Sequence, residues 1–270
     1  MRSVNEISQD APELSFEKGS KFVIFSDLHK GDGNADDGFA RNRNIYLHAL
    51  NHYWSEDYTY IELGDGEDLW KVPNYNVIKD IYPEIMTLRL NFQSAGRLYE
   101  FAGNHDLEKL DKNWLKANDY PVTDIHEGMY LHYGSHTFFL IHGHQADFFD
   151  STIWMVMRWV NYYPNRLFQL LGMADFTRAA KDFTKRNFIE RKLIKWAQDN
   201  NTTIIAGHTH KPALSPSEGY FNSGSGMHPN GVTCLEFSDG SVKLCLWQES
   251  VRKNGDIYVK KAVIKSANLD

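Results

Sequence analysis

The stretch KFVIFSDLH, residues 21–29, joins a short apolar run to two polar side chains. Its first five residues are rich in β-branched and aromatic side chains, which is typical of a buried β-strand. Asp27 and His29 follow where such a strand would end. This combination indicates the fold class if other strands of the chain end in the same way.

The same arrangement, an apolar run followed by polar residues, occurs four more times. These stretches are YTYIELGDGED (58–68), LYEFAGNHD (98–106), HTFFLIHGH (136–144) and TTIIAGHTH (202–210). Helix-like stretches such as 35–54 and 76–94 separate them, and Pro83 is expected to interrupt the second helix. Strands that alternate with helices indicate an α/β fold whose strand-end loops share one edge and converge on a site.

Composition restricts the class of protein. The chain has 270 residues, of which 42% are hydrophobic and 14% aromatic, enough for a substantial core. Its net charge of −6 disfavours a general polyanion binder, so nucleic acid is not the expected partner. The first twenty residues do not resemble a signal peptide and no eighteen consecutive residues are apolar, which predicts a cytoplasmic protein without a transmembrane segment.

The region after residue 212 is expected to be rich in β-strands. A two-residue turn at 239–240 sets a hairpin register in which Cys234 faces Cys245. This register is compatible with a disulfide, but without a secretory signal two reduced thiols are the favoured interpretation.

Residues 146–200 interrupt the strand series with a helical pattern. We expect them to form a helical cap inserted into a single domain that spans residues 1–270. Nine Lys and Arg against four acidic residues give the segment 151–200 a local charge of +5. Its apolar side chains include Trp154, Met155, Met157, Trp159, Tyr162, Tyr163 and Phe168. They could bind an apolar substrate group, with the basic residues on a phosphate. The alternative is an ordinary helical subdomain with its aromatic residues packed inside.

The polar residues after the five runs are of the kind that bind metals. Carboxylate oxygens and imidazole nitrogens, without thiolates, suit Mn, Fe, Zn, Co or Ni, and a carboxylate can bridge two ions. Two ions about 3.5–4 Å apart can activate water and neutralise a phosphoryl group. Each cluster alone is more simply interpreted as a cap or a turn, but five of them after strands predict a metal centre. The histidines without ligand spacing are 48, 52, 126, 132, 136 and 228.

In order, SDLH, LGDGED, AGNHD, IHGH and AGHTHKP resemble the five sequence blocks of the calcineurin-like metallophosphoesterases. The resemblance covers residues 22–226, because YFNSGS also looks like a strand of that family. It implies a four-layer α-β-β-α sandwich and a phosphatase or phosphodiesterase. The implied cofactors are two divalent or trivalent metal ions, with Mn, Fe or Zn expected.

The resemblance also assigns roles to single residues. The implied metal ligands are Asp27, His29, Asp65 and His210 for the first ion, and Asp65, Asn104, His142 and His208 for the second. His105 would be the catalytic residue that protonates the leaving oxygen, with Asp106 as its orienting partner. Asp68 and His144 are expected behind the ligands or facing the substrate. The implied mechanism is in-line attack on phosphorus by a hydroxide that bridges the two metals.

Within this superfamily, GDGEDLW, HGHQADFFD and the helical segment look like the UDP-2,3-diacylglucosamine hydrolase branch. That branch carries Arg in its third block and Asp in its fourth, where this chain has His105 and His144. The expected substrate is a phosphorylated small molecule, a nucleotide-lipid or a phosphoprotein, and the cap could contact a membrane peripherally. A protein Ser/Thr phosphatase, a nuclease and an inactive scaffold are the alternatives, and the scaffold is disfavoured because every block is intact.

Overall fold

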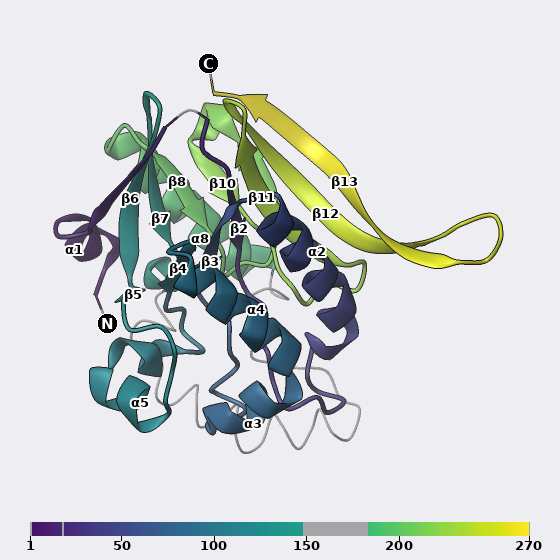
Figure 1. Ribbon diagram of the computed structural model, residues 1–270. Coiled ribbons are helices and arrows are strands. Elements are labelled where there is room, and N and C mark those ends of the chain that lie inside the picture. The colour runs from purple at the N-terminus through teal and green to yellow at the C-terminus, as the bar shows by residue number, and fades with distance from the viewer. Residues whose placement is uncertain (1, 18, 148–182, 270) are drawn as a thin grey trace.

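The computed structural model describes residues 2–17, 19–147 and 183–269, in which two β-sheets form the centre (Figure 1). The seven-stranded sheet has the order β13 (Ile257–Asn268), β12 (Ser241–Val251), β11 (Val232–Ser238), β2 (Phe22–Phe25), β3 (Thr59–Leu63), β4 (Leu98–Phe101) and β5 (Ile125–His126). The six-stranded sheet has the order β1 (Glu13–Phe16), β6 (Gly128–Tyr133), β7 (His136–Ile141), β8 (Thr203–Ala206), β10 (Tyr220–Asn222) and β9 (Ala213–Ser215). All five runs that the sequence predicts as strands are strands, namely β2, β3, β4, β7 and β8.

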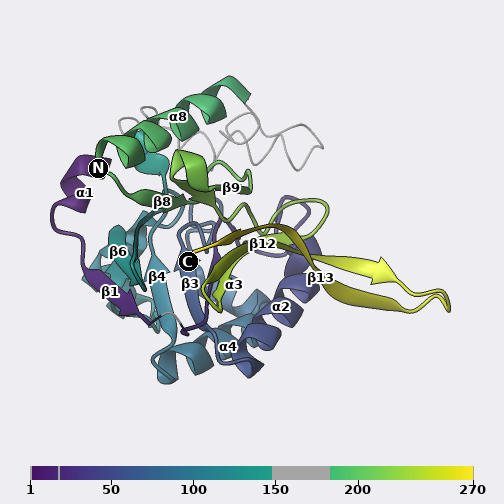
Figure 2. The same ribbon diagram turned by 90° about the horizontal axis from the view of Figure 1, so that it is seen from above.

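Helices cover the outer face of each sheet (Figure 2). Helices α2 (Arg43–Ser55), α3 (Tyr75–Ile81) and α4 (Pro83–Ser94) pack on the seven-stranded sheet, and α1 (Val4–Ser8) and α8 (Phe183–Asp199) pack on the six-stranded sheet. Shorter helical elements are α5 (Lys112–Ala117), η1 (Ala40–Asn42), η2 (Leu107–Leu110), η3 (His144–Ala146) and η6 (Pro216–Glu218). The chain therefore forms the four-layer α-β-β-α sandwich that the resemblance implies.

The alternation of side chains along β2 shows how one strand serves two layers. Phe22 and Ile24 enter the core between the two sheets, whereas Val23 and Phe25 enter the core beneath the helices. A strand buried on both faces is typically apolar along most of its length, which explains the continuous FVIF run. Pro83 begins α4, so the predicted interruption between two helices is confirmed.

The predicted hairpin at 239–240 is also confirmed. β11 and β12 pair with Cys234 opposite Cys245, and both thiols are free and buried. The β12–β13 hairpin continues past the body of the molecule as a long two-stranded arm (Figures 1 and 2).

The last part of the segment that we expect to be a cap is helix α8, which belongs to the outer helical layer of the sandwich. Ile189 and Leu193 of α8 pack on the outer face of the six-stranded sheet. Residues 148–182, with the apolar side chains from Trp154 to Phe168, lie outside the described residues, so the role of the cap stays a prediction. None of the described helices is long and apolar enough to cross a membrane.

Candidate metal centre

The predicted ligands gather at the carboxyl ends of the parallel strands of both sheets. β2, β3 and β4 are parallel neighbours in one sheet, and β7 and β8 are parallel neighbours in the other. Backbone hydrogen bonds continue this pairing into the loops: Asp27 N–H donates to Gly64 O (3.1 Å), and Gly207 N–H donates to the carbonyl of His142 (2.9 Å). The loops after β2 and β3 are therefore fixed to each other beyond the ends of their strands, and so are the loops after β7 and β8.

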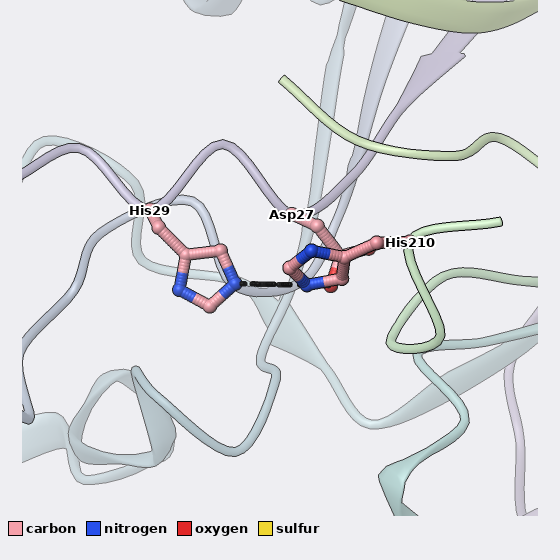
Figure 3. Close-up of side chains that lie close together, drawn as sticks. All are labelled: Asp27, His29 and His210. Atoms are coloured by element: carbon pink, nitrogen blue, oxygen red, sulfur yellow. Dashed lines mark hydrogen bonds and ion pairs between the residues drawn. The ribbon is translucent and has the colours of Figure 1, made fainter. Parts of the chain in front are cut away.

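Asp27, His29 and His210 form the first group of candidate ligands (Figure 3). His210 Nε2 lies 3.1 Å from Asp27 Oδ1 and 3.3 Å from His29 Nε2. Donor atoms that each lie about 2.1 Å from a common ion in tetrahedral geometry are about 3.4 Å apart, so this spacing fits one ion. Two residues from one end of the chain and one from the other thus converge on a single point.

Asp65, His142 and His208 form a second group, whose ligand atoms also lie within 4.8 Å of one another. His142 Nε2 lies 3.3 Å from Asp65 Oδ2, and the same oxygen lies 3.4 Å from His29 Nε2. The Nδ1–H of His142 donates to Leu63 O (2.8 Å), which fixes the tautomer and directs Nε2 toward the carboxylate. One carboxylate oxygen therefore lies within 3.4 Å of a histidine nitrogen of each group.

Buried polar atoms at this point have no hydrogen-bond partner within the described chain. They include Asp27 Oδ1, Asn104 Oδ1 and His142 Nε2, three atoms of predicted ligands. An unpaired buried polar atom is costly, and native structures rarely tolerate one without a further partner. A cation is the partner that these oxygen and nitrogen atoms share, so the residues present fit the implied metal ions.

The electrostatics of the buried groups lead to the same conclusion. Burial would raise the pKa of Asp27, but the imidazoles of His210 and His142 lower the pKa to about 2. Burial would lower the pKa of His142, but the carboxylates of Asp65 and Asp27 raise the pKa to about 10. The carboxylates thus require positive charge beside them, which a bound cation supplies in place of a proton.

His105 lies with His29 and Asp65 in a further group of possible ligands, and its imidazole is held from two sides. Its Nδ1 lies 2.9 Å from Asp68 Oδ1, and the ring of Trp70 stacks on its imidazole with the centroids 4.2 Å apart. Trp70 is 2% exposed, and the sequence did not identify it; an aromatic residue two positions after Asp68 was the available signal.

The structure corrects the prediction that Asp106 orients the imidazole of His105. Its carboxylate accepts hydrogen bonds from the backbone N–H of Gly103 (2.7 Å) and of Gly66 (2.9 Å), and pairs with Lys109 (2.7 Å). The chain turns at His105, so the side chain of the next residue points back under the loop. Asp68 occupies the orienting position in its place.

The two histidines of the IHGH block lie in different surroundings. His142 belongs to a ligand group, whereas His144 belongs to none of the groups found among the described residues. His144 is 1% exposed, and burial, with the charges of His142 and His208 beside it, lowers its pKa well below the usual value. Asp147, which the sequence did not identify, places Oδ2 3.7 Å from His208 Nε2.

Comparison with known proteins gives one family. The model of the calcineurin-like phosphoesterase family matches residues 20–212, most of the chain. No curated protein matches.

Among solved structures, a conserved uncharacterized protein from Streptococcus pneumoniae TIGR4, described as a predicted phosphoesterase, is 16% identical over 90% of this chain and 98% of that chain, with a TM-score of 0.34. Vps29 from Chaetomium thermophilum is 13% identical over 92% and 97%, with a TM-score of 0.43. A novel archaeal phosphodiesterase is 16% identical over 90% and 99%, with a TM-score of 0.37.

Proposed function

The chain belongs to the calcineurin-like phosphoesterase family, which makes it a metal-dependent phosphoester hydrolase, and we propose that it uses two metal ions to cleave a phosphoester or pyrophosphate P–O bond. The observation that carries this proposal is the position of Asp65 Oδ2, 3.4 Å from His29 Nε2 and 3.3 Å from His142 Nε2. A carboxylate shared in this way is the ligand that bridges two ions. A site for one ion would not need it.

Asp27, His29 and His210 would hold one ion, Asn104, His142 and His208 the other, and Asp65 both. When bound, the two ions supply the activated water and neutralise the phosphoryl oxygens. The protein's own part is then to position the substrate and to move a proton. Few protein side chains then need to take part in the chemistry, because phosphoryl transfer depends mainly on charge stabilisation and alignment.

His105 is the proposed proton donor to the leaving oxygen. Its Nδ1 faces the Asp68 carboxylate, which makes the opposite ring nitrogen, Nε2, the proposed proton donor. Burial would raise the pKa of Asp68, but the neighbouring imidazole of His105 lowers it below its usual value, and the carboxylate stays ionised. An ionised Asp68 stabilises the protonated imidazole that a general acid needs.

A substrate panel tests the proposed reaction. The protein is stripped of metal, reconstituted with Mn²⁺, and assayed with a chromogenic monoester, the matching diester and a nucleotide-lipid pyrophosphate. We expect hydrolysis that requires metal, and the preferred member of the panel assigns the substrate class. Hydrolysis of no member by the reconstituted protein would contradict the proposal and favour a scaffold.

The His105→Ala variant tests the proposed proton donor. Loss of a general acid is expected to lower kcat about 100- to 10,000-fold. Metal content should stay at the wild-type level, because His105 is not among the seven proposed ligands. Full activity of this variant at saturating substrate would exclude the role.

A further inference from the structure

A cluster of buried charged side chains lies directly behind the metal centre. Its members are Lys30, Glu62, Glu67, Arg89, Glu100, Asp106 and Lys109, and none is more than 2% exposed. We call this set the buried ion cluster. The proposed reaction uses none of these residues, so their presence beneath the site requires a separate explanation.

The cluster receives side chains from all three ligand-bearing loops of the seven-stranded sheet. Lys30 lies in the first loop, Glu67 lies in the second, and Asp106 and Lys109 belong to the third. Lys30 Nζ lies 3.3 Å from Glu67 Oε1, so the first two loops are joined. Loops that hold the metal ligands at their tips therefore meet a second time, below those ligands.

The base of the cluster is rigid. Glu62 belongs to β3 and Glu100 to β4, and Arg89 of α4 lies 3.4 Å and 2.7 Å from their respective carboxylates. Strand and helix residues of this kind have little freedom to move, because backbone hydrogen bonds and packing fix both elements. The other members of the cluster come from the loops.

Lys109 connects this rigid base to the loops. Its Nζ lies 2.8 Å from Glu100 Oε1 and 2.7 Å from Asp106 Oδ2, and it also pairs with Glu67. A single ammonium group with three donors is thus shared by one strand and two loops. No other cation of the cluster bonds to Asp106 in the contacts that the structure shows.

Asp106 transmits this attachment to the ligand loops. Its carboxylate accepts from the backbone N–H groups of Gly66 (2.9 Å) and Gly103 (2.7 Å), which flank two predicted ligands, Asp65 and Asn104. A fixed carboxylate that holds both turns sets the distance between them. Displacement of Asp106 would move both ligands.

The buried charges make the loss of any one member of the cluster costly. The cluster contains four carboxylates and three cations, all removed from water. Loss of one member of a buried ionic network leaves its partners buried and unpaired, and the carboxylates would then separate. We expect the consequence in the loops, because the strands are also held by the hydrogen bonds of their sheet.

We propose that Lys109 is a positioning residue that sets the geometry of the metal centre, by holding Asp106 and Glu67 against the base of the buried ion cluster. The inference rests on the proposed function, since it assumes that the loops bind metal. Partners that orient metal ligands from behind typically change metal affinity about 10- to 100-fold when they are removed. The same range is expected here.

The test compares three variants of the full-length protein. Lys109→Met removes the charge and keeps the length of the side chain. Lys112→Met makes the same change at an exposed site three residues further along. Leu131→Ala lowers stability in the core between the sheets, away from the loops. Each stripped protein is titrated with Mn²⁺ by calorimetry, and its unfolding midpoint is measured. We expect only Lys109→Met to bind Mn²⁺ about 10- to 100-fold more weakly.

A charge-balanced variant separates positioning from general stability. Lys109→Met/Glu100→Gln removes one cation and one carboxylate, so its unfolding midpoint should recover relative to Lys109→Met. Its Mn²⁺ affinity should stay low, because Asp106 still lacks its ion pair with Lys109. It also provides the measurement if Lys109→Met alone does not fold. Wild-type Mn²⁺ affinity in the double variant would overturn the proposal, as would an equal loss of affinity in Leu131→Ala. These results concern Mn²⁺ binding alone, so an inactive wild-type protein would count against the proposed reaction and not against Lys109.

Discussion

Asp68→Asn is the substitution that most directly tests how the chain prepares its proton donor. The carboxylate lies 2.9 Å from His105 Nδ1 and is 3% exposed, and the buried Trp70 covers the other side of the imidazole. Asn keeps the size of the side chain and removes its charge. An Asn amide can also turn its NH₂ group toward the ring, and the imidazole would then adopt the wrong tautomer.

The expected magnitude follows from the distance. At 2.9 Å and an effective dielectric constant of about 20, a carboxylate and an imidazolium attract each other by about 6 kcal/mol, which is an upper bound. A hydrogen bond to a charged group contributes about 1.5–3 kcal/mol net, because the folded site replaces water. Each 1.4 kcal/mol changes a rate about tenfold, so kcat should fall about 10- to 100-fold.

The assay uses two substrates that differ in their need for a proton. An alkyl phosphate leaves as a strongly basic alkoxide, whereas a nitrophenyl phosphate leaves as a stabilised phenolate. The loss of kcat in Asp68→Asn should be large for the first and small for the second, because only the alkoxide must be protonated as it departs. The control is Asp111→Asn at an exposed helix cap, where no change is expected.

Two results would refute this reasoning. An equal loss for both substrates would mean that Asp68 does not act through proton donation. A loss of bound metal, measured by elemental analysis, would assign Asp68 to the metal centre. Its other oxygen lies 3.9 Å from His29 Nδ1, beyond hydrogen-bond distance, so we expect metal content to stay unchanged.

Two further predictions concern neighbouring residues. His142→Ala should lose one of the two metal ions while His144→Ala keeps both, as measured by elemental analysis, and the reverse pattern would exchange their roles. Trp70→Leu should lower kcat about two- to tenfold, because a stacked aromatic pair contributes about 0.5–1.5 kcal/mol beyond its buried area. The double variant Trp70→Leu/His105→Ala should then be no slower than His105→Ala alone, and additive losses would show that Trp70 acts elsewhere.

The sequence predicts much of the fold because strand and ligand are adjacent in it. An apolar run that stops at Asp27, His142 or His208 fixes both the strand and the end of the sheet at which the polar group lies. The hairpin at 239–240 is similarly local, so the position of Cys234 opposite Cys245 follows from turn geometry alone. Features that depend on residues adjacent in the chain can therefore be predicted from the sequence.

The orienting carboxylate and the buried ion cluster depend on contacts between distant segments. Asp106 stands next to His105 in the chain, but Asp68, 37 positions away, bonds to the imidazole. Glu62 and Glu100 interrupt otherwise apolar strands, which is a signal that a charged partner is buried nearby. The sequence does not identify that partner as Lys109, because no local pattern joins a strand to a turn that follows another strand.

Backbone geometry gives a reason why the ligand loops need such support. Asp27, His29, Asp65, His208 and His210 all have φ between 49° and 62°, the left-handed region that non-glycine residues rarely adopt. Each such residue lowers the free energy of unfolding by about 1 kcal/mol or more. Five of them are therefore a large effect compared with the roughly 5–15 kcal/mol by which a domain is stable.

Strain of this kind persists only where the surroundings enforce it. Here the surroundings are the pairing of one loop with the next, the amide groups that Asp106 fixes, and the ions that the ligands would share. The strained residues are also the ones that point donor atoms inward, so relaxation of a loop would both relieve strain and disperse the ligands. The buried ion cluster opposes that relaxation from beneath, which is why its loss should be measured first as weaker metal binding and only second as lower stability.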